Sequence, residues 1–239
     1  MSKSPDLMTM LQSGVHFGHQ LSKRHPKMKP YIFTEKSGFH IIDLEQTQIK
    51  LQEALEFVKK IVANGGTILF LGTKKQAQPI ITKYAKECGM PYVTERWLGG
   101  TFTNFAEIKK LVKNFSELKK RKQTGQLEKY TKKEKLDFDR EIEKLDKIVG
   151  GIEIMTKTPD AIFVCDIKKE KTAVSEAMTK NIPIVAMCDT NVNPEKINYP
   201  IPANDDAIKS IELITSLICE AVKEGIKERQ PASVAPVKK

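Results

Sequence analysis

The stretch "GGTILFLGTKKQA", residues 65–77, decides the fold class, because it describes a buried strand that runs into a glycine and then into a helix. Its centre, Ile68 to Leu71, is apolar at every position, whereas a strand with one wet face alternates apolar and polar residues. Two later runs have the same character, "AIFV" at 161–164 and "IPIVAM" at 182–187. Such strands are typical of a parallel sheet with helices on both faces, so we predict an α/β fold.

Amphipathic helical stretches separate these strands. The predicted helices cover residues 45–66, 74–88, 169–181 and about 205–228. Two further short strands are predicted at residues 39–44 and 90–95. Strands that alternate with helices of this length indicate crossover connections, which place parallel strands in one sheet. The sheet domain is therefore expected to comprise residues 1–102 and 150–228.

One segment, residues 103–149, breaks this alternation because it contains no strand candidate. Two helical stretches meet near Gly125, and each carries a narrow apolar stripe with coiled-coil spacing. The stripes consist of Ile108, Leu111, Val112, Phe115 and Leu118, and of Phe138, Ile142, Leu145 and Val149. We predict a coiled-coil-like helical hairpin inserted into the sheet domain. Residues 229–239, rich in Pro and Ala, are predicted to form a mobile tail.

Composition narrows the possible partners. The chain has 239 residues and a formal net charge of +10, from 40 Lys and Arg against 30 Asp and Glu. This surplus favours an acidic partner such as nucleic acid. No apolar run reaches the roughly 18 residues that a spanning helix needs, and the first residues lack a signal-peptide pattern, so we expect a cytoplasmic protein without membrane contact. The four cysteines contain no CxxC pair and are expected to be reduced core residues.

The turn after Gly72 invites comparison with nucleotide-binding loops. "GTKKQAQ" contains one glycine, whereas the Walker and dinucleotide patterns need several so that backbone N–H groups can face a phosphate. We therefore predict that no nucleotide or other organic cofactor binds here. Lys74 and Lys75, at the start of a helix, would still attract a phosphate of an RNA backbone, and the alternative is a solvated helix start.

Two acids at strand ends are consistent with an alternative interpretation, in which the protein is an enzyme. Asp166 and Asp189 follow apolar strands and should lie at the carboxyl edge of the sheet, where ligands of doubly wound folds bind. They would suit a phosphate-binding enzyme of that class, but acids in such positions also commonly cap the following helices. The sequence contains no G-x-S-x-G or HExxH motif, and its four histidines all precede residue 41.

Two stretches combine basic, aromatic and hydrogen-bonding residues, as RNA-binding surfaces do. Residues 15–33, "VHFGHQLSKRHPKMKPYIF", are predicted to form a basic loop, and residues 95–105, "ERWLGGTFTNF", a corner with the single tryptophan. The alternatives are a solvated loop and a packed corner in which Trp97 wedges the hairpin against the sheet. The predicted RNA-binding residues, including two hairpin lysines, are His16, Lys23, Arg24, Lys27, Lys29, Lys74, Lys75, Arg96, Thr101, Thr103, Asn104, Lys109 and Lys110.

A zinc site is a further hypothesis. His16 and His19 precede the first strand, Asp189 ends a late strand, and Asp205 opens the last helix next to Asp206, so these side chains are expected to converge at one edge of the sheet. His16, His19, Asp189 and Asp205 would offer the mixed nitrogen and oxygen ligands that zinc accepts. The alternative is that His19 is hydrogen-bonded to a carboxylate without a metal, since no short-range ligand spacing supports the site.

Five motifs carry a family resemblance. They are "MLQSGVHFGHQ", "FLGTKKQAQ", "RWLGGTFTNF", "PDAIFVCDIKKEKTAVSEAMTKNIP" and "YPIPANDDA". Together and in this order they resemble the bacterial second protein of the small ribosomal subunit, over residues from about 4 to 228, and the combination is highly specific. Ala203 stands where that family usually has a glycine, which concerns only how tightly the last motif turns.

The resemblance implies a flavodoxin-like parallel sheet with a protruding helical hairpin, and a non-catalytic structural protein of the cytoplasmic ribosome. It implies binding to ribosomal RNA between the head and body of the small subunit, beside neighbouring ribosomal proteins. It also implies support for the first and largest small-subunit protein, which captures messenger RNA, in joining the subunit. A free RNA-binding regulator is a third interpretation, which differs in that its binding would survive without assembled subunits.

Overall fold

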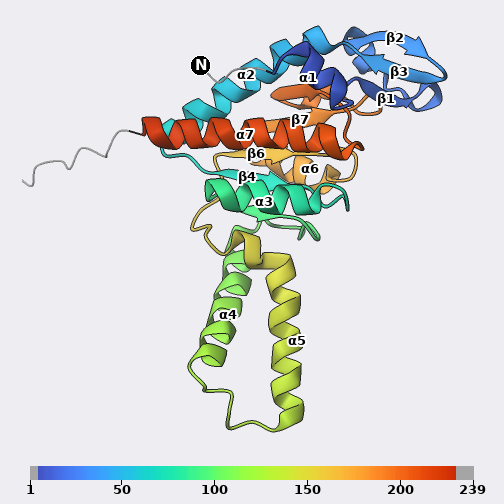
Figure 1. Ribbon diagram of the computed structural model, residues 1–239. Helices are drawn as coiled ribbons and strands as arrows, with labels where there is room; N and C mark the ends of the chain where they lie inside the picture. Colours follow the sequence, from blue (N-terminus) through green and yellow to red (C-terminus); the bar gives the residue numbers. More distant parts are fainter. Residues whose placement is uncertain (1–4, 230–239) are drawn as a thin grey trace, which may run out of the picture.

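A five-stranded parallel sheet forms the centre of the protein (Figure 1). The computed structural model describes residues 5–229. The strands are β4 (Ile68–Leu71), β5 (Tyr92–Val93), β6 (Ala161–Val164), β7 (Ile184–Cys188) and β8 (Tyr199–Pro202). Their spatial order is β5-β4-β6-β7-β8, which is the flavodoxin-like order for doubly wound sheets. The predicted α/β fold is confirmed.

Helices cover both faces of this sheet. Alternate strand residues point to opposite faces, so Phe70 and Phe163 pack in one core while Leu69 and Ile162 pack in the other. The first core is closed by α2 (Leu44–Ala63), α3 (Gln78–Cys88) and α7 (Ile208–Glu228). The second is closed by α6 (Lys171–Thr179) and by the corner at residues 96–104. The ends of α4 (Phe105–Gln123) and α5 (Lys132–Val149) that are nearest the sheet also pack against it. This double burial explains why the central strands are apolar throughout.

The N-terminal part forms a second sheet that the sequence analysis did not predict. Its antiparallel strands are β1 (Phe17–Gln20), β2 (Ile32–Lys36) and β3 (Phe39–Ile42), in the order β1-β3-β2, and the short helix α1 (Leu7–Gln12) precedes them. The strand expected at 39–44 exists, but it belongs to this small sheet. Ser37 and Gly38 have φ values of 51° and 84° and make the two-residue turn between β2 and β3.

The prediction of a continuous loop at residues 15–33 is therefore wrong. The segment contains β1, two 3₁₀ helices, η1 (Leu21–Lys23) and η2 (Pro26–Tyr31), and the start of β2. Pro26 opens η2, where its missing N–H costs nothing, and buried Met28 anchors the segment to the second core. The polar composition concealed this structure, because the strands are short and most of their residues are exposed or half-buried.

Where the sequence predicts a helical hairpin, the structure has α4 (Phe105–Gln123) and α5 (Lys132–Val149), which project from the sheet (Figure 1). Phe115 and Val149 are buried near the base of the projection, and Leu111 and Ile142 are partly buried against the same core. Thr131 and Glu134 form a reciprocal capping box at the start of α5. The short helix η3 (Gly150–Ile152) returns the chain to the sheet.

Several boundaries differ from the predicted ones. Helix α3 begins at Gln78 rather than at Lys74, and α7 begins at Ile208. Strand β8 was missed because Pro200 and Pro202 argue against a central strand, and it lies at the edge of the sheet, where proline is tolerated. A short 3₁₀ helix, η4 (Pro194–Lys196), precedes it. Apart from Arg229, the predicted tail lies outside the described residues. No helix between residues 5 and 229 combines the length and hydrophobicity that crossing a bilayer requires.

Candidate nucleic-acid interface

The basic segment of the N-terminal part presents its cations to solvent. Lys23, Arg24, Lys27 and Lys29 are all exposed, and they lie on or beside η1 and η2. Lys27 forms an ion pair with Glu195 at 2.8 Å, which is exposed on both sides. The Nδ1 atom of His25 accepts a hydrogen bond from the Lys27 backbone N–H at 3.2 Å and caps η2. These short helices hold the cations on a surface with a defined shape.

His16 lies apart from these cations. Its ring packs on Phe17 with centroids 4.0 Å apart, and its Nδ1 atom is buried without a hydrogen-bond partner. Burial lowers the pKa of His16, so the neutral imidazole is favoured. The side chain lines an apolar hollow with Phe33 and Ile41 rather than a basic surface.

The corner at residues 96–104 is held by a residue that the sequence analysis missed, Glu176 of α6. Its carboxylate accepts hydrogen bonds from the Trp97 indole at 3.1 Å and from the Thr103 hydroxyl at 3.1 Å. It also accepts three backbone N–H groups of the corner, those of Gly100 at 2.8 Å, Phe102 at 3.0 Å and Thr103 at 3.1 Å. The available signal was a glutamate on the buried face of an amphipathic helix, beside Ala173 and Ala177.

Glu176 is ionised in this setting. Burial acts to raise the pKa of its carboxyl group, but the hydrogen bonds from Phe102, Trp97, Gly100 and Thr103 outweigh burial and lower the pKa below its usual value. The Thr101 hydroxyl is buried too and donates to the Leu98 carbonyl at 2.6 Å. Trp97 and the two threonine hydroxyls are therefore used inside the protein, whereas Arg96 and Asn104 are exposed.

The turn after β4 is filled by the protein's own side chains. The Thr73 N–H, which would face a phosphate in a nucleotide-binding loop, donates to the Glu170 carboxylate at 2.9 Å, and the Thr73 hydroxyl donates to the same oxygen. The Lys169 ammonium donates to the Thr73 carbonyl at 2.9 Å. A Cβ atom on Gly72 would meet Ile81 at 3.0 Å, so this glycine serves close packing of strand and helix. Lys75 is exposed.

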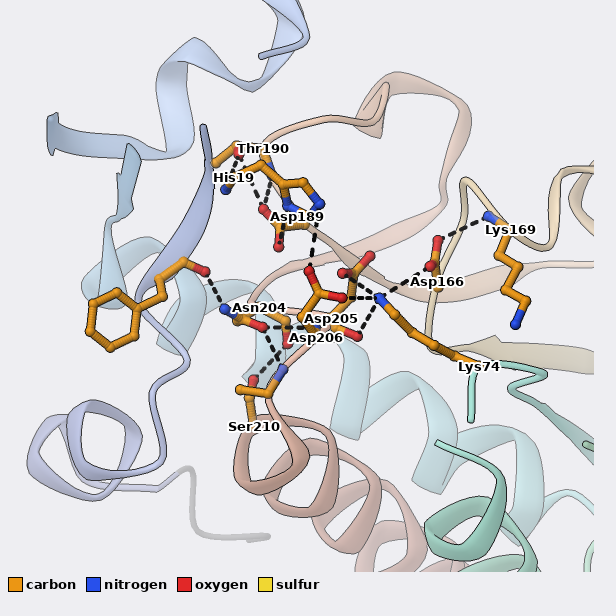
Figure 2. A network of polar contacts seen from close by, with 12 residues as sticks. His19, Lys74, Asp166, Lys169, Asp189, Thr190, Asn204, Asp205, Asp206 and Ser210 are labelled. Atoms are coloured by element: carbon orange, nitrogen blue, oxygen red, sulfur yellow. Dashed lines mark hydrogen bonds and ion pairs between the residues drawn. The ribbon is translucent and has the colours of Figure 1, made fainter. Parts of the chain in front are cut away.

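Lys74 is held in an acidic network (Figure 2). Its Nζ atom lies 2.6 Å from Asp206, 3.0 Å from Asp205 and 3.3 Å from Asp166. Burial acts to lower the pKa of Lys74, but these carboxylates outweigh burial and raise it. The Lys74 ammonium is therefore committed to an internal contact, while it stays charged.

Four side chains of the same network, His19, Asp189, Asp205 and Asp206, offer ligand atoms within 4.8 Å of one another. The His19 Nδ1 atom lies 3.0 Å from Asp189, and its Nε2 atom lies 3.6 Å from Asp206. The hydrogen bond to Asp189 is the main cause that raises the pKa of His19. Burial, with Asp166 and Asp189 nearby, raises the pKa of Asp205 to about 7. His16, one of the predicted ligands, is not in this group.

The network also joins the two sheets. Asn204 donates to the Phe17 carbonyl of β1 at 2.6 Å and accepts the N–H groups of Asp206 and Ala207, both at 2.7 Å, before α7 begins. The His19 N–H donates to the Thr190 hydroxyl at 2.9 Å. The cluster is thus a polar clip between β1, the end of β7 and the start of α7, and its nitrogen and oxygen donors are of the type that zinc accepts.

The two acids of the enzyme alternative are both engaged. Asp166 accepts the Lys169 N–H at 2.9 Å, as a capping carboxylate does, and pairs with Lys74. Asp189 is 1% exposed and faces His19. Both carboxylates are thus engaged by partners within the protein, which favours the structural interpretation over phosphoryl chemistry.

The chain matches a known family across the whole of this architecture. A profile of the family described as ribosomal protein S2 matches residues 10–225. The chain belongs to this family. Members of the family that resemble it include the small ribosomal subunit proteins uS2 of Salinibacter ruber, Nocardia farcinica and Rhodococcus opacus. Each is 51% identical to it over 92% of the chain, and the matches cover 69%, 77% and 76% of these relatives, respectively.

Membership in the ribosomal protein S2 family confirms the resemblance and the expectation of a non-enzymatic protein of the ribosome. It also agrees with the expected cytoplasmic location, since the ribosome is cytoplasmic. The four cysteines are free and buried, as predicted for reduced core residues.

Proposed function

We propose that this protein is a structural constituent of the small ribosomal subunit that binds ribosomal RNA between the head and the body. The observation that carries the proposal is the family match over residues 10–225, on a chain with a net charge of +10. Exposed cations at Lys23 to Lys29, Lys75, Arg96, Lys109 and Lys110 support contact with RNA phosphates. Specificity then comes from the shape of folded RNA, because contacts to phosphates carry no sequence information of their own.

A second surface supports contact with another ribosomal protein. The hollow lined by α1, β2 and β3 measures about 380 Å³, and around it Phe33 is 75% exposed, Met8 57% and Leu11 45%. Exposed apolar side chains gathered at one hollow favour a protein partner over an RNA backbone. We propose that this N-terminal hollow supports recruitment of the first and largest small-subunit protein, the one that captures messenger RNA.

Sedimentation tests the RNA proposal directly. The purified protein is added to small subunits depleted of it and run on sucrose gradients at low and high salt. We expect cosedimentation that weakens with salt, because neutralised phosphates release counterions. Replacing Lys23, Arg24, Lys27 and Lys29 with glutamine should reduce the salt slope by up to about one unit per lost phosphate contact. Unchanged affinity and salt slope would show that this segment is a solvated surface, and binding to isolated RNA alone would favour a free regulator.

A further inference from the structure

A second hollow lies where the hairpin leaves the sheet, between the corner and α5. It measures about 370 Å³, within the usual range for ligand sites, which begins near 300 Å³. Its lining is mostly charged and comes from two elements, with Arg96 of the corner facing the hairpin. The lining residues are Glu95, Arg96, Arg140, Glu143, Lys144, Lys147 and Ile148. We call it the hinge hollow.

The cations of α5 in the hinge hollow share one face of the helix. Arg140, Lys144 and Lys147 follow one another at spacings of four and three residues, so they form a single stripe about 10 Å long. This stripe lies opposite the seam that Ile142 and Leu145 contribute toward α4. The acids of α5 are mostly on its other faces. Although acids and bases balance over α5 as a whole, this stripe is therefore locally basic.

These cations lack internal partners. In the part of the chain that the structure describes, Arg96, Lys144 and Lys147 form no ion pair within 4.0 Å, and Arg140 reaches only Asp137, at 3.8 Å. By contrast, Lys122 on α4 pairs closely with Asp139, at 2.8 Å. The hinge hollow is lined by four cations and only two acids, so the cations repel one another. An external anion offsets that repulsion.

The hinge hollow is built on rigid supports. Arg96 precedes Trp97, which the Glu176 hydrogen bonds hold in place, and the basic stripe ends just before buried Val149. A ligand held by Arg96 and the stripe together would bridge the sheet and the hairpin. It would also set the angle at which the hairpin leaves the sheet, because the two halves of the site belong to different elements.

We propose that the hinge hollow binds a phosphodiester segment of RNA, which contacts the corner and α5 together. The inference rests on the proposed ribosomal RNA binding and names a site for it. Arginine forks and lysines match phosphate oxygens. Glu95 and Glu143 would accept hydrogen bonds from ribose hydroxyl groups, which lie next to the phosphates along an RNA chain. The lining therefore fits RNA better than a protein partner.

The test compares two variants that lose equal charge. In the first, Arg96, Arg140, Lys144 and Lys147 become glutamine. In the matched control, four exposed lysines of the sheet domain, Lys60, Lys180, Lys209 and Lys227, become glutamine. Affinity for depleted small subunits is measured between 50 and 200 mM salt. We expect the first variant to lose at least about tenfold in affinity and about one unit of salt slope per lost contact, and the control to stay near wild type.

Two further measurements make the outcome specific. All four side chains are exposed, so thermal unfolding of the free variant should match wild type, and K144R/K147R should keep the wild-type salt slope. A photo-crosslinking amino acid at Glu143 should attach to ribosomal RNA in reconstituted subunits. If wild type fails to bind subunits, the proposed function itself fails. If wild type binds and the first variant binds equally well, or the crosslink forms only to protein, the hinge hollow is not an RNA site.

Discussion

Single buried charges hold parts of this protein that are far apart in sequence. Glu176 accepts five hydrogen bonds from the corner, and Lys74 joins three aspartates from two later loops. Such groups are stabilising only while every partner is present, because a buried donor without an acceptor costs about 1–3 kcal/mol. Single substitutions at these residues therefore test how the candidate surfaces are held in place.

Replacing Glu176 with glutamine should destabilise the protein by about 3 kcal/mol. The amide keeps one acceptor oxygen but turns the other into a donor, so corner N–H groups lose their partner and the charge is gone. Urea unfolding measures the loss, and Glu212→Gln at an exposed pair should change stability by less than about 0.5 kcal/mol. A similarly small effect for Glu176→Gln would contradict the role given to this carboxylate.

The same residue predicts a pH dependence. Hydrogen bonding lowers the pKa of Glu176 below its ordinary 4.5, so its contribution is complete above pH 4.5 and is lost as the pH falls through the lower folded-state pKa. The difference in unfolding free energy between wild type and Glu176→Gln should therefore shrink on acidification below pH 4.5. A difference that is constant from pH 7 to pH 3 would rule out an ionised Glu176.

The cluster of His19, Asp189, Asp205 and Asp206 is where the zinc hypothesis can be tested against its metal-free alternative, now without His16. If the cluster holds zinc, protein purified without chelators should contain the metal and His19→Ala should lose it, because the imidazole is the one nitrogen ligand among these four residues. If His19 is instead only hydrogen-bonded to Asp189, neither protein should contain zinc. Elemental analysis measures the content, with His25→Ala as the control. A zinc content below about a tenth of an equivalent in the wild-type protein would reject the zinc site. The cluster would then serve only as the polar clip between β1, β7 and α7.

At the scale of elements, close backbone approach decides the packing of α2 against α7. Gly225 lies in α7, and a Cβ atom there would meet the Lys59 carbonyl oxygen of α2 at 2.7 Å. Alanine is normally better than glycine in a helix by about 0.8–1 kcal/mol. Here we expect Gly225→Ala to destabilise the protein by about 1–3 kcal/mol, since the helices must separate. Calorimetry that shows a higher melting temperature would contradict this packing.

The hairpin, by contrast, is expected to contribute little to the stability of the sheet domain. Its outer faces are charged, and it contacts the sheet mainly at its base. We predict that replacing residues 103–149 with a short Gly-Ser linker leaves a sheet domain that unfolds cooperatively. The physical reason is that the hairpin helices supply only Ile108, Phe115 and Val149 of the buried residues in the second core, and the others come from the sheet domain. Urea unfolding followed by circular dichroism tests this, and the loss of a cooperative transition would show that the hairpin base is an essential part of the core.

At the scale of the whole molecule, an apolar hollow lies beside α1, β2 and β3, and a mostly charged hollow lies between the corner and α5. Phe33→Ala at the N-terminal hollow should reduce incorporation of the first and largest small-subunit protein by about tenfold, the size of a modest interface hot spot. It should leave the protein's own cosedimentation with subunits unchanged. Ile154→Ala, which removes another exposed apolar side chain, is the control. Equal incorporation with both variants would exclude this hollow as the docking surface.

The amino-acid sequence by itself determined the central strands, the helices between them and the seam of the hairpin. Each of these rests on periodicity over neighbouring residues, as in Ile68 to Leu71 or in Ile142 and Leu145, and the burial of an apolar face enforces that pattern locally. The flavodoxin-like strand order was expected from the family motifs, and the observed order β5-β4-β6-β7-β8 agrees with it. Exposed cations such as Lys23 and Arg24 were also predictable from composition.

Only the tertiary structure decided which polar residues are free to act. Lys74 looked like a phosphate ligand, but it is paired with Asp205, 131 residues away, and the corner that looked like an RNA contact is bound by Glu176, more than 70 residues away. His16 and His19 are three residues apart, yet one lines an apolar hollow and the other an acidic cluster. Sequence patterns report the local face of an element, whereas the partner of a buried charge is chosen by the packing of distant elements.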